Sequence, residues 1–263
     1  MKNTYRCLIG ISFLLTLALI VVGAYLLAEK AWIEMMYAYA VSTLGLLILV
    51  LFLMSLFFQE TLKQSLWLPS LLLITVVFQA LLGMWAVTKL PAPVTAAGHL
   101  YGAMTTLSLL WLLWLFQSKQ IKYSASLFTS SLLRIRLMAG VALLAVIIQI
   151  ALGGWISAYD EYRILDNHAL TVVRMLYRDG AVAVSLLVGG FGIWLLAFWR
   201  GVAGKAAVII LILLFIQWTL IVLNGVVTLP LMVAKAHILG ASLLLLAVIA
   251  ANYRLWRVHK PLE

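Results

Sequence analysis

Cysteine, histidine and acidic residues are all scarce in this chain of 263 residues. The single cysteine, Cys7, rules out an internal disulfide and argues against a metal or redox site built from cysteines. The chain has only 8 Asp and Glu residues against 18 Lys and Arg residues. A net charge of +10 can indicate a nucleic-acid partner, but the basic residues lie in short loops between apolar runs. We therefore expect no nucleic-acid partner.

Apolar residues make up 66% of the chain, and the mean hydropathy is +1.15. A membrane-spanning helix needs about 20 apolar residues to cross about 30 Å of hydrocarbon. Runs of this length predict an all-α integral membrane protein with eight transmembrane helices in contact with lipid. The first run is longer than the apolar region of a signal peptide, so we predict that it is a span. The predicted spans lie near 9–28, 33–58, 66–88, 94–117, 132–157, 170–199, 206–229 and 231–256.

The basic residues predict the orientation of the spans. Eight crossings put both termini on one side, and twelve of the 18 Lys and Arg residues fall on that side. Basic loops stay in the cytoplasm, so we expect cytoplasmic termini in a plasma membrane, the inner membrane of a bacterium. The six on the opposite, outer side are Lys30, Lys89, Arg163, Arg174, Arg178 and Lys235.

Two segments of the chain repeat each other around a histidine. His99 follows Gln79 by 20 residues, and His237 follows Gln217 by the same interval. Each histidine comes after a Leu-Pro pair and opens an H-x-x-G-A segment. The repeat unit is four spans long, so the halves are predicted to be parallel four-helix-bundle repeats, unlike the inverted repeats of many transporters. The predicted divisions are an N-terminal repeat at 1–117, a cytoplasmic linker at 118–131 and a C-terminal repeat at 132–263.

A duplicated histidine in an apolar bundle predicts a duplicated cofactor site, with haem as the first candidate. Both His99 and His237 lie about 8–9 Å below the outer ends of their predicted helices. An imidazole at this depth can ligate haem iron, and ionisable groups inside a membrane are usually functional. The alternative is that each histidine only forms a hydrogen bond with a neighbouring helix.

Three charged residues near the outer ends of the second and sixth spans are further candidates. Glu34 opens the second span and is a candidate functional acid. The alternative is that it only stabilises the helix, because the helix dipole favours an acidic side chain at the N-terminus. Arg174 and Arg178, four residues apart in the sixth span, can bind carboxylates such as haem propionates. Alternatively, they extend to the outer interface and pair with Asp166 or Asp179.

These motifs resemble the haem A synthase family, whose members act in cytochrome oxidase biogenesis. The resemblance covers nearly the whole chain. The family's fourth-helix histidines match His99 and His237, and its Gln-x-x-Leu-Gly-Gly-Trp segment matches 149–155 and, more loosely, 79–85. The family's Glu-x-x-His-Arg motif aligns with 34–38 and its His-Arg-x-x-Ala motif with 177–181. At both second positions the family's histidine is replaced by tyrosine, Tyr37 and Tyr177, and the family's extended first outer loop is missing.

The resemblance implies a role for each candidate. His237, with Tyr177, would hold a haem b cofactor, and His99, with Tyr37, would hold haem O as the substrate, with Glu34 as the acid. The reaction would oxidise the C8 methyl of haem O towards haem A. Haem O synthase and cytochrome oxidase subunits would be partners, and no metal other than haem iron is predicted. Tyrosine ligation favours ferric iron and a low reduction potential. The lost histidines, the missing loop and the parallel repeats leave two other interpretations open. One is a non-catalytic haem-binding or oxidase-assembly relative, and the other is a small-solute transporter.

Overall fold

The computed structural model describes residues 1–23, 31–62, 65–86, 92–117, 129–161, 168–198, 202–226 and 230–257. Within these ranges every regular element is an α-helix, which confirms the all-α prediction. Eight of the helices are long and apolar enough to cross a membrane, so the predicted number of spans is confirmed as well. The helices are α1 (Lys2–Gly23), α2 (Ala31–Phe57), α3 (Gln59–Leu62), α4 (Trp67–Ala86), α5 (Ala92–Gln117), α6 (Thr129–Glu161), α7 (His168–Phe198), α8 (Val202–Val226) and α9 (Pro230–Arg257).

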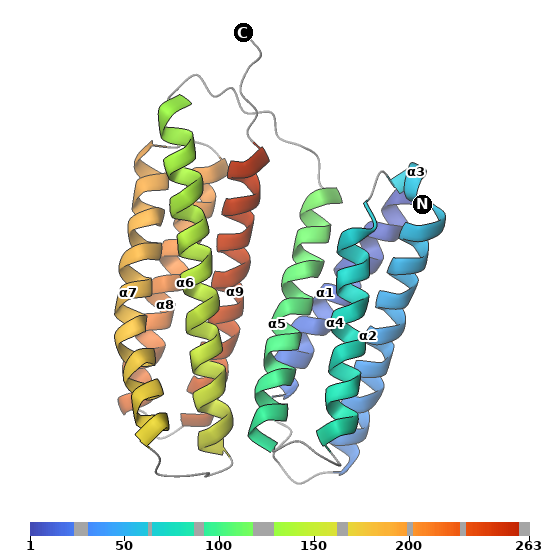
Figure 1. The fold of residues 1–263 in the computed structure, drawn as a ribbon, viewed down its shortest axis with the longest axis horizontal. Helices are drawn as coiled ribbons and strands as arrows, with labels where there is room; N and C mark the ends of the chain where they lie inside the picture. Colours follow the sequence, from blue (N-terminus) through green and yellow to red (C-terminus); the bar gives the residue numbers. More distant parts are fainter. Residues whose placement is uncertain are drawn as a thin grey trace. The chain divides into compact units, whose positions relative to one another are not determined.

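The chain divides into two compact units, Met1–Ser118 and Lys119–Glu263. In the first unit α1 packs on α2 and α5, and α4 packs on the same two helices, so the four spans close into a ring. In the second unit α6, α7, α8 and α9 close into a ring in the same order. Figure 1 shows the four long helices of each unit side by side, as in an up-and-down four-helix bundle. The diagonal partners are therefore α2 with α5, and α7 with α9.

Prolines mark where several of these helices begin. Pro69, Pro93 and Pro230 all lie within the first three residues of α4, α5 and α9. A proline costs little there, because the first turn of a helix has no internal partner for its N–H groups. Two features were not predicted. The first helix starts at Lys2 rather than near residue 9, and the short helix α3 follows the second span.

The early start of α1 has a packing reason. Tyr5 is fully buried in the apolar core of the first unit, and its hydroxyl lies 2.7 Å from that of Ser55 in α2. Ile9, one turn further, is also fully buried. The first turn of α1 is therefore part of the bundle interior, although Lys2 and Arg6 make it look like a polar flank in the sequence.

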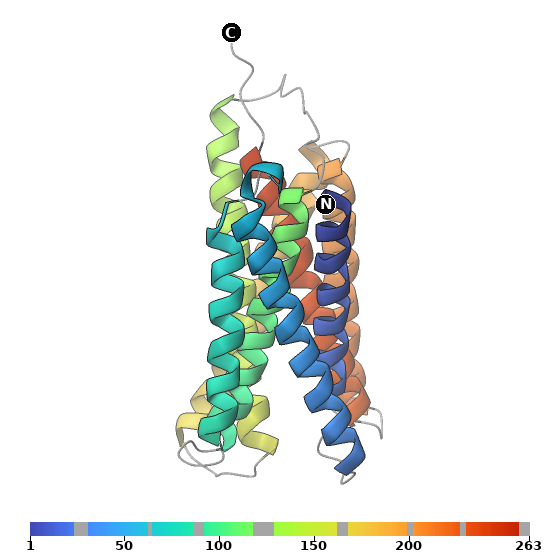
Figure 2. The same cartoon turned by 90° about the vertical axis from the view of Figure 1, so that its right-hand side faces the viewer.

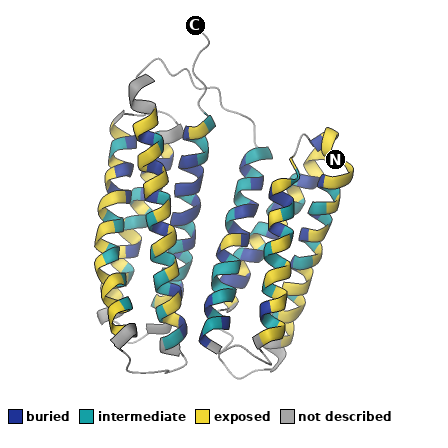
Figure 3. Ribbon diagram, in the orientation of Figure 1, coloured by how far each residue is buried: buried dark blue, intermediate teal, exposed yellow. Residues whose placement is uncertain are grey.

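The outward faces of the helices are exposed (Figure 3), and they carry many large apolar side chains. Leu46 in the first unit and Leu186 and Phe215 in the second have exposed fractions of 62%, 72% and 73%. A water-soluble bundle would place polar residues there, whereas lipid tails solvate such faces well. The chain is therefore an integral membrane protein.

Candidate functional site

The two repeated histidines occupy the same position in their helices. His99 lies seven residues after the first residue of α5, and His237 lies seven residues after the first residue of α9. With a rise of 1.5 Å per residue, each is about 10 Å from the start of its helix. Both side chains are half-buried.

In the second unit, Tyr177 and His237 meet inside the bundle. The Tyr177 hydroxyl of α7 lies 3.2 Å from Nε2 of His237 in α9, within hydrogen-bonding distance. Since α7 and α9 are diagonal partners, this bond crosses the bundle interior. The structure thus brings together the two residues of this half that the sequence proposed as a pair.

In the first unit, the corresponding pair is not joined. Within the described residues no hydrogen bond links Tyr37 of α2 to His99 of α5, and Tyr37 packs against the apolar core instead. Figure 2 shows α2 leaning away from α4 towards its N-terminal end, and Tyr37 lies only six residues into α2. The two halves therefore share a topology but differ in how their candidate ligands are arranged.

A glycine of the adjacent helix lies against the ring of one candidate ligand in each unit. A Cβ atom added to Gly153 of α6 would lie 2.9 Å from Cε2 of Tyr177 and 3.3 Å from its hydroxyl oxygen. A Cβ atom added to Gly83 of α4 would lie 3.9 Å from the nearest atoms of the His99 ring. The Tyr177 ring thus fills the space that a side chain at 153 would need, whereas the His99 ring leaves room for a methyl group.

This difference predicts different effects on stability for the same substitution at the two glycines. We expect Gly153→Ala to displace Tyr177 from His237 and to lower the free energy of unfolding by about 1–3 kcal/mol, as overpacking does. We expect Gly83→Ala to be neutral or to stabilise α4 by up to about 1 kcal/mol, because alanine favours helix more than glycine. Thermal unfolding of both variants in one detergent measures the difference. Equal destabilisation by the two would contradict the tight contact at Gly153.

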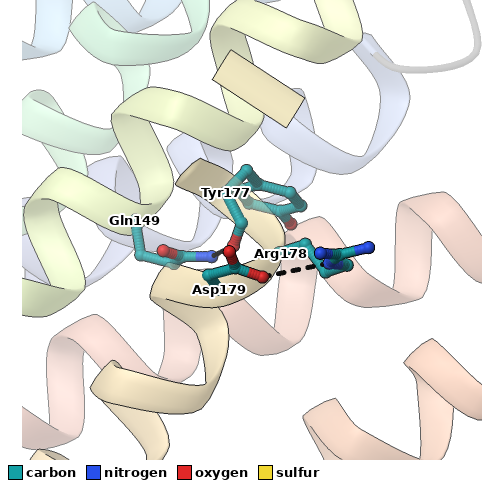
Figure 4. A network of polar contacts seen from close by, with 4 residues as sticks. All are labelled: Gln149, Tyr177, Arg178 and Asp179. Atoms are coloured by element: carbon teal, nitrogen blue, oxygen red, sulfur yellow. Dashed lines mark hydrogen bonds and ion pairs between the residues drawn. The ribbon is translucent and has the colours of Figure 1, made fainter. Parts of the chain in front are cut away.

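The candidate arginines lie at the surface of the second unit. The Arg178 guanidinium donates to the Asp179 carboxylate at 3.0 Å, and the two side chains are 78% and 69% exposed (Figure 4). Pairing with Asp179 is one of the two alternatives that the sequence left open. Arg174 is exposed as well, on the same helix.

Several predicted features lie outside the described part of the chain. Glu34 is placed on α2, but its side chain is not described. Asp166 and the Leu-Pro segment at 90–91 also fall outside it. The predicted linker at 118–131 is described only from Thr129, where α6 has already begun.

Three glutamines mark the repeat in the sequence, and two of them form hydrogen bonds with the candidate ligands. Gln149 Nε2 donates to the backbone carbonyl of Tyr177 at 2.8 Å, and Gln217 Nε2 donates to that of His237 at 3.3 Å. The available signal was a lone amide side chain in the middle of an apolar span. Lys235, counted among the basic residues of the outer side, lies within α9 and is only 6% exposed.

The donor set fits haem better than a bare metal ion. Within the ranges that the structure describes, no group of three or more His, Cys, Asp or Glu side chains could hold such an ion. Haem iron is already held by the porphyrin and needs only one or two axial ligands, which His99, His237 and the tyrosines can supply. In the second unit, Tyr177 of α7 and His237 of α9 are the residues that would hold the haem iron.

Comparison with known proteins identifies similar chains. The sequence model of a family described as cytochrome oxidase assembly protein matches residues 26–249. The chain is also similar to Heme A synthase of Shewanella oneidensis, with 33% identity over 270 aligned positions. The alignment covers 88% of this chain and 78% of the Shewanella protein.

Proposed function

This chain belongs to the cytochrome oxidase assembly protein family, and from that premise we propose that it works as a haem A synthase. The proposed reaction oxidises the C8 methyl of haem O towards the formyl of haem A. Membership of this family leaves the small-solute transporter reading without support.

One observation supports this proposal most directly. His99 and His237 occupy equivalent positions in two four-helix bundles, at the same depth and half-buried. An enzyme that oxidises one haem with the help of a second haem needs two haem sites, each with an axial histidine. The C-terminal half, with His237 and Tyr177, is proposed to hold haem b as the cofactor, and the N-terminal half, with His99 and Tyr37, to hold haem O.

The residues of the chain have three proposed tasks. His99 and His237 would hold the haem iron through an imidazole nitrogen. Glu34 is the acid beside the substrate haem, where it positions the reacting edge or accepts a proton. Arg174 and Arg178 lie at the surface where propionates would emerge, and Arg178 would exchange Asp179 for a propionate. Haem iron supplies the oxidising chemistry when bound, while the apolar bundle around it excludes water.

The proposal is tested in a bacterium that makes haem O but lacks its own haem A synthase. We expect cells that express the chain to contain haem A or its hydroxylated precursor when extracted haems are separated by chromatography. Glu34→Gln should lower that yield about 100-fold or more, the usual contribution of a general acid or base. Glu60→Gln, at an exposed acid of α3, is the matched control and should leave the yield unchanged. An unchanged yield in Glu34→Gln would remove this role from Glu34.

A second candidate function is supported by the Tyr177–His237 hydrogen bond. This bond occupies the imidazole nitrogen that would otherwise be available to iron. A chain that keeps the haem-binding fold without the reaction would act in haem delivery or oxidase assembly. A purified protein that carries haem, in cells that contain no haem A, would favour this candidate over the synthase.

The proposed setting follows from the same family. Haem O synthase would supply the substrate, and cytochrome oxidase subunits would receive the product. The proposed location is the plasma membrane of a bacterium, and the positive-inside pattern supports cytoplasmic termini. Protease accessibility of tags at each terminus in right-side-out vesicles tests the orientation.

A further inference from the structure

Three contacts between neighbouring helices share one composition, a glutamine of one helix lying over a glycine of the next. The pairs are Gln79–Gly102 between α4 and α5, Gln149–Gly180 between α6 and α7, and Gln217–Gly240 between α8 and α9. A Cβ atom on Gly102 would lie 2.5 Å from Cγ of Gln79, and one on Gly180 would lie 2.8 Å from Oε1 of Gln149. A Cβ atom on Gly240 would overlap the amide of Gln217. In all three pairs the glutamine fills space that only a glycine leaves open.

Each of these glycines lies at a fixed distance from a candidate haem ligand. Gly102 lies three positions after His99, and the glycine follows the candidate ligand by the same interval in the other two pairs. Residues three apart share a face of a helix. Each glutamine therefore packs against the helix that carries a candidate ligand. It contacts that helix one turn from the ligand and on the same face.

The hydrogen bonds of the glutamines strengthen this relation in the second unit. Gln149 and Gln217 donate to the backbone carbonyls of Tyr177 and His237 themselves, at 2.8 and 3.3 Å (Figure 4 shows the first). A helix carbonyl can accept a second bond because its oxygen has two lone pairs. In the first unit Gln79 instead donates to the Thr106 hydroxyl at 3.0 Å, one turn beyond Gly102.

The fourth ligand position lacks both members of the pair. Three residues after Tyr37 the chain has Ala40 rather than glycine, and α1, the helix before it, contains no glutamine. This is also the candidate ligand that forms no hydrogen bond with its histidine among the described residues. Glutamine and glycine are thus present together at three positions and absent together at the fourth.

We infer that Gln79, Gln149 and Gln217 are positioning residues, each of which sets the rotation and depth of a helix that carries a candidate haem ligand. Their role towards haem rests on the proposed function. In the second unit Gln149 contacts α7 and Gln217 contacts α9, so both ligand-bearing helices are positioned and the Tyr177 hydroxyl lies at His237. In the first unit Gln79 contacts α5, but no glutamine of α1 contacts α2, and Tyr37 packs in the apolar core.

The test uses substitutions that keep the shape of glutamine and remove its hydrogen bonds. Gln149→Met and Gln217→Met retain an unbranched side chain over the glycine but have no donor. Asn252→Leu is the matched control. Its amide also donates to a carbonyl of another helix, from Nδ2 to the Ala139 oxygen at 2.8 Å. It lies fifteen residues after His237 on α9, about 22 Å away along the helix.

The first measurement needs no haem. Histidine-selective ¹⁵N labelling of the full chain in detergent gives signals from only four histidines, and His237→Ala identifies the one of interest. The Nε2 resonance of His237 reports its hydrogen bond with Tyr177. We expect both methionine variants to shift this resonance and Asn252→Leu to leave it in place. An unshifted resonance in both methionine variants, or an equal shift in the control, would overturn the inference.

The second measurement is the rate at which bound haem b leaves the protein for excess apomyoglobin. We expect the methionine variants to lose haem about 3- to 20-fold faster, the range that interhelical hydrogen bonds in membranes support, and Asn252→Leu to match the unsubstituted chain. If the methionine variants shift the His237 Nε2 resonance but lose haem at the unchanged rate, the glutamines position His237 without affecting haem binding. That result would overturn their proposed role towards haem. A chain that binds no haem b would refute the proposed function, while the resonance would still decide the positioning role.

Discussion

His99→Ala/His237→Ala is expected to purify without the Soret band of the unsubstituted protein. His237 meets Tyr177 inside its bundle, and His99 is half-buried beside Gly83 of α4. Imidazoles are the strongest candidate iron ligands in the described part of the chain. Removal of both should lower bound haem by at least about tenfold, because the imidazole–iron bond of each half is lost. The visible spectrum of the oxidised and dithionite-reduced protein, normalised to protein concentration, measures the loss. Each single variant should retain the haem of the other half.

The chain has its own control for this experiment. Only two other histidines exist, His168 at the first residue of α7 and His259 near the C-terminus, beyond the described residues. The double variant His168→Ala/His259→Ala should keep the full Soret band. His99→Leu/His237→Leu separates a lost ligand from a cavity, since leucine fills most of the space. Full haem content in that variant, with an unchanged spectrum, would contradict histidine ligation in either half.

Tyr177→His is expected to convert the haem of the C-terminal half to a low-spin, six-coordinate state. The Tyr177 hydroxyl lies 3.2 Å from Nε2 of His237, so a histidine at 177 starts close to the opposite side of the same site. Tyrosine favours ferric iron and lowers the reduction potential, whereas a second imidazole does not. We therefore expect the potential to rise by on the order of 100 mV, within the about 0.8 V that axial ligands span. Redox titration of the purified protein, followed in the visible spectrum, measures it.

Tyr177→Phe is the matched variant, because it keeps the ring against Gly153 and removes the hydroxyl. It should give a five-coordinate, high-spin haem held by His237 alone. If Tyr177→His and Tyr177→Phe have the same spectrum and potential, residue 177 does not reach the iron. Tyr177 would then act only as a hydrogen-bond partner of His237.

The number of spans follows from the sequence alone for a simple physical reason. A bilayer core about 30 Å thick must be crossed by about 20 apolar residues, and the chain has eight such runs. The equivalence of His99 and His237 was also readable, because so few polar residues occur in these runs that a repeated spacing is conspicuous. The ends of the helices were less readable. Tyr5 is buried although cationic residues flank it, so hydropathy placed the start of α1 too late.

The arrangement around the histidines depended on the tertiary structure. Apolar residues surround every side of a membrane helix, so the sequence carries little information about which face points inward. Both halves have a tyrosine and a histidine at corresponding positions, yet only Tyr177 and His237 form a hydrogen bond. The contacts of the glutamines with glycines of the next helix were equally hidden, because they depend on how closely two helices approach and how each is rotated. The sequence by itself thus determined the membrane fold and singled out the candidate haem ligands, and helix packing decided which of them meet.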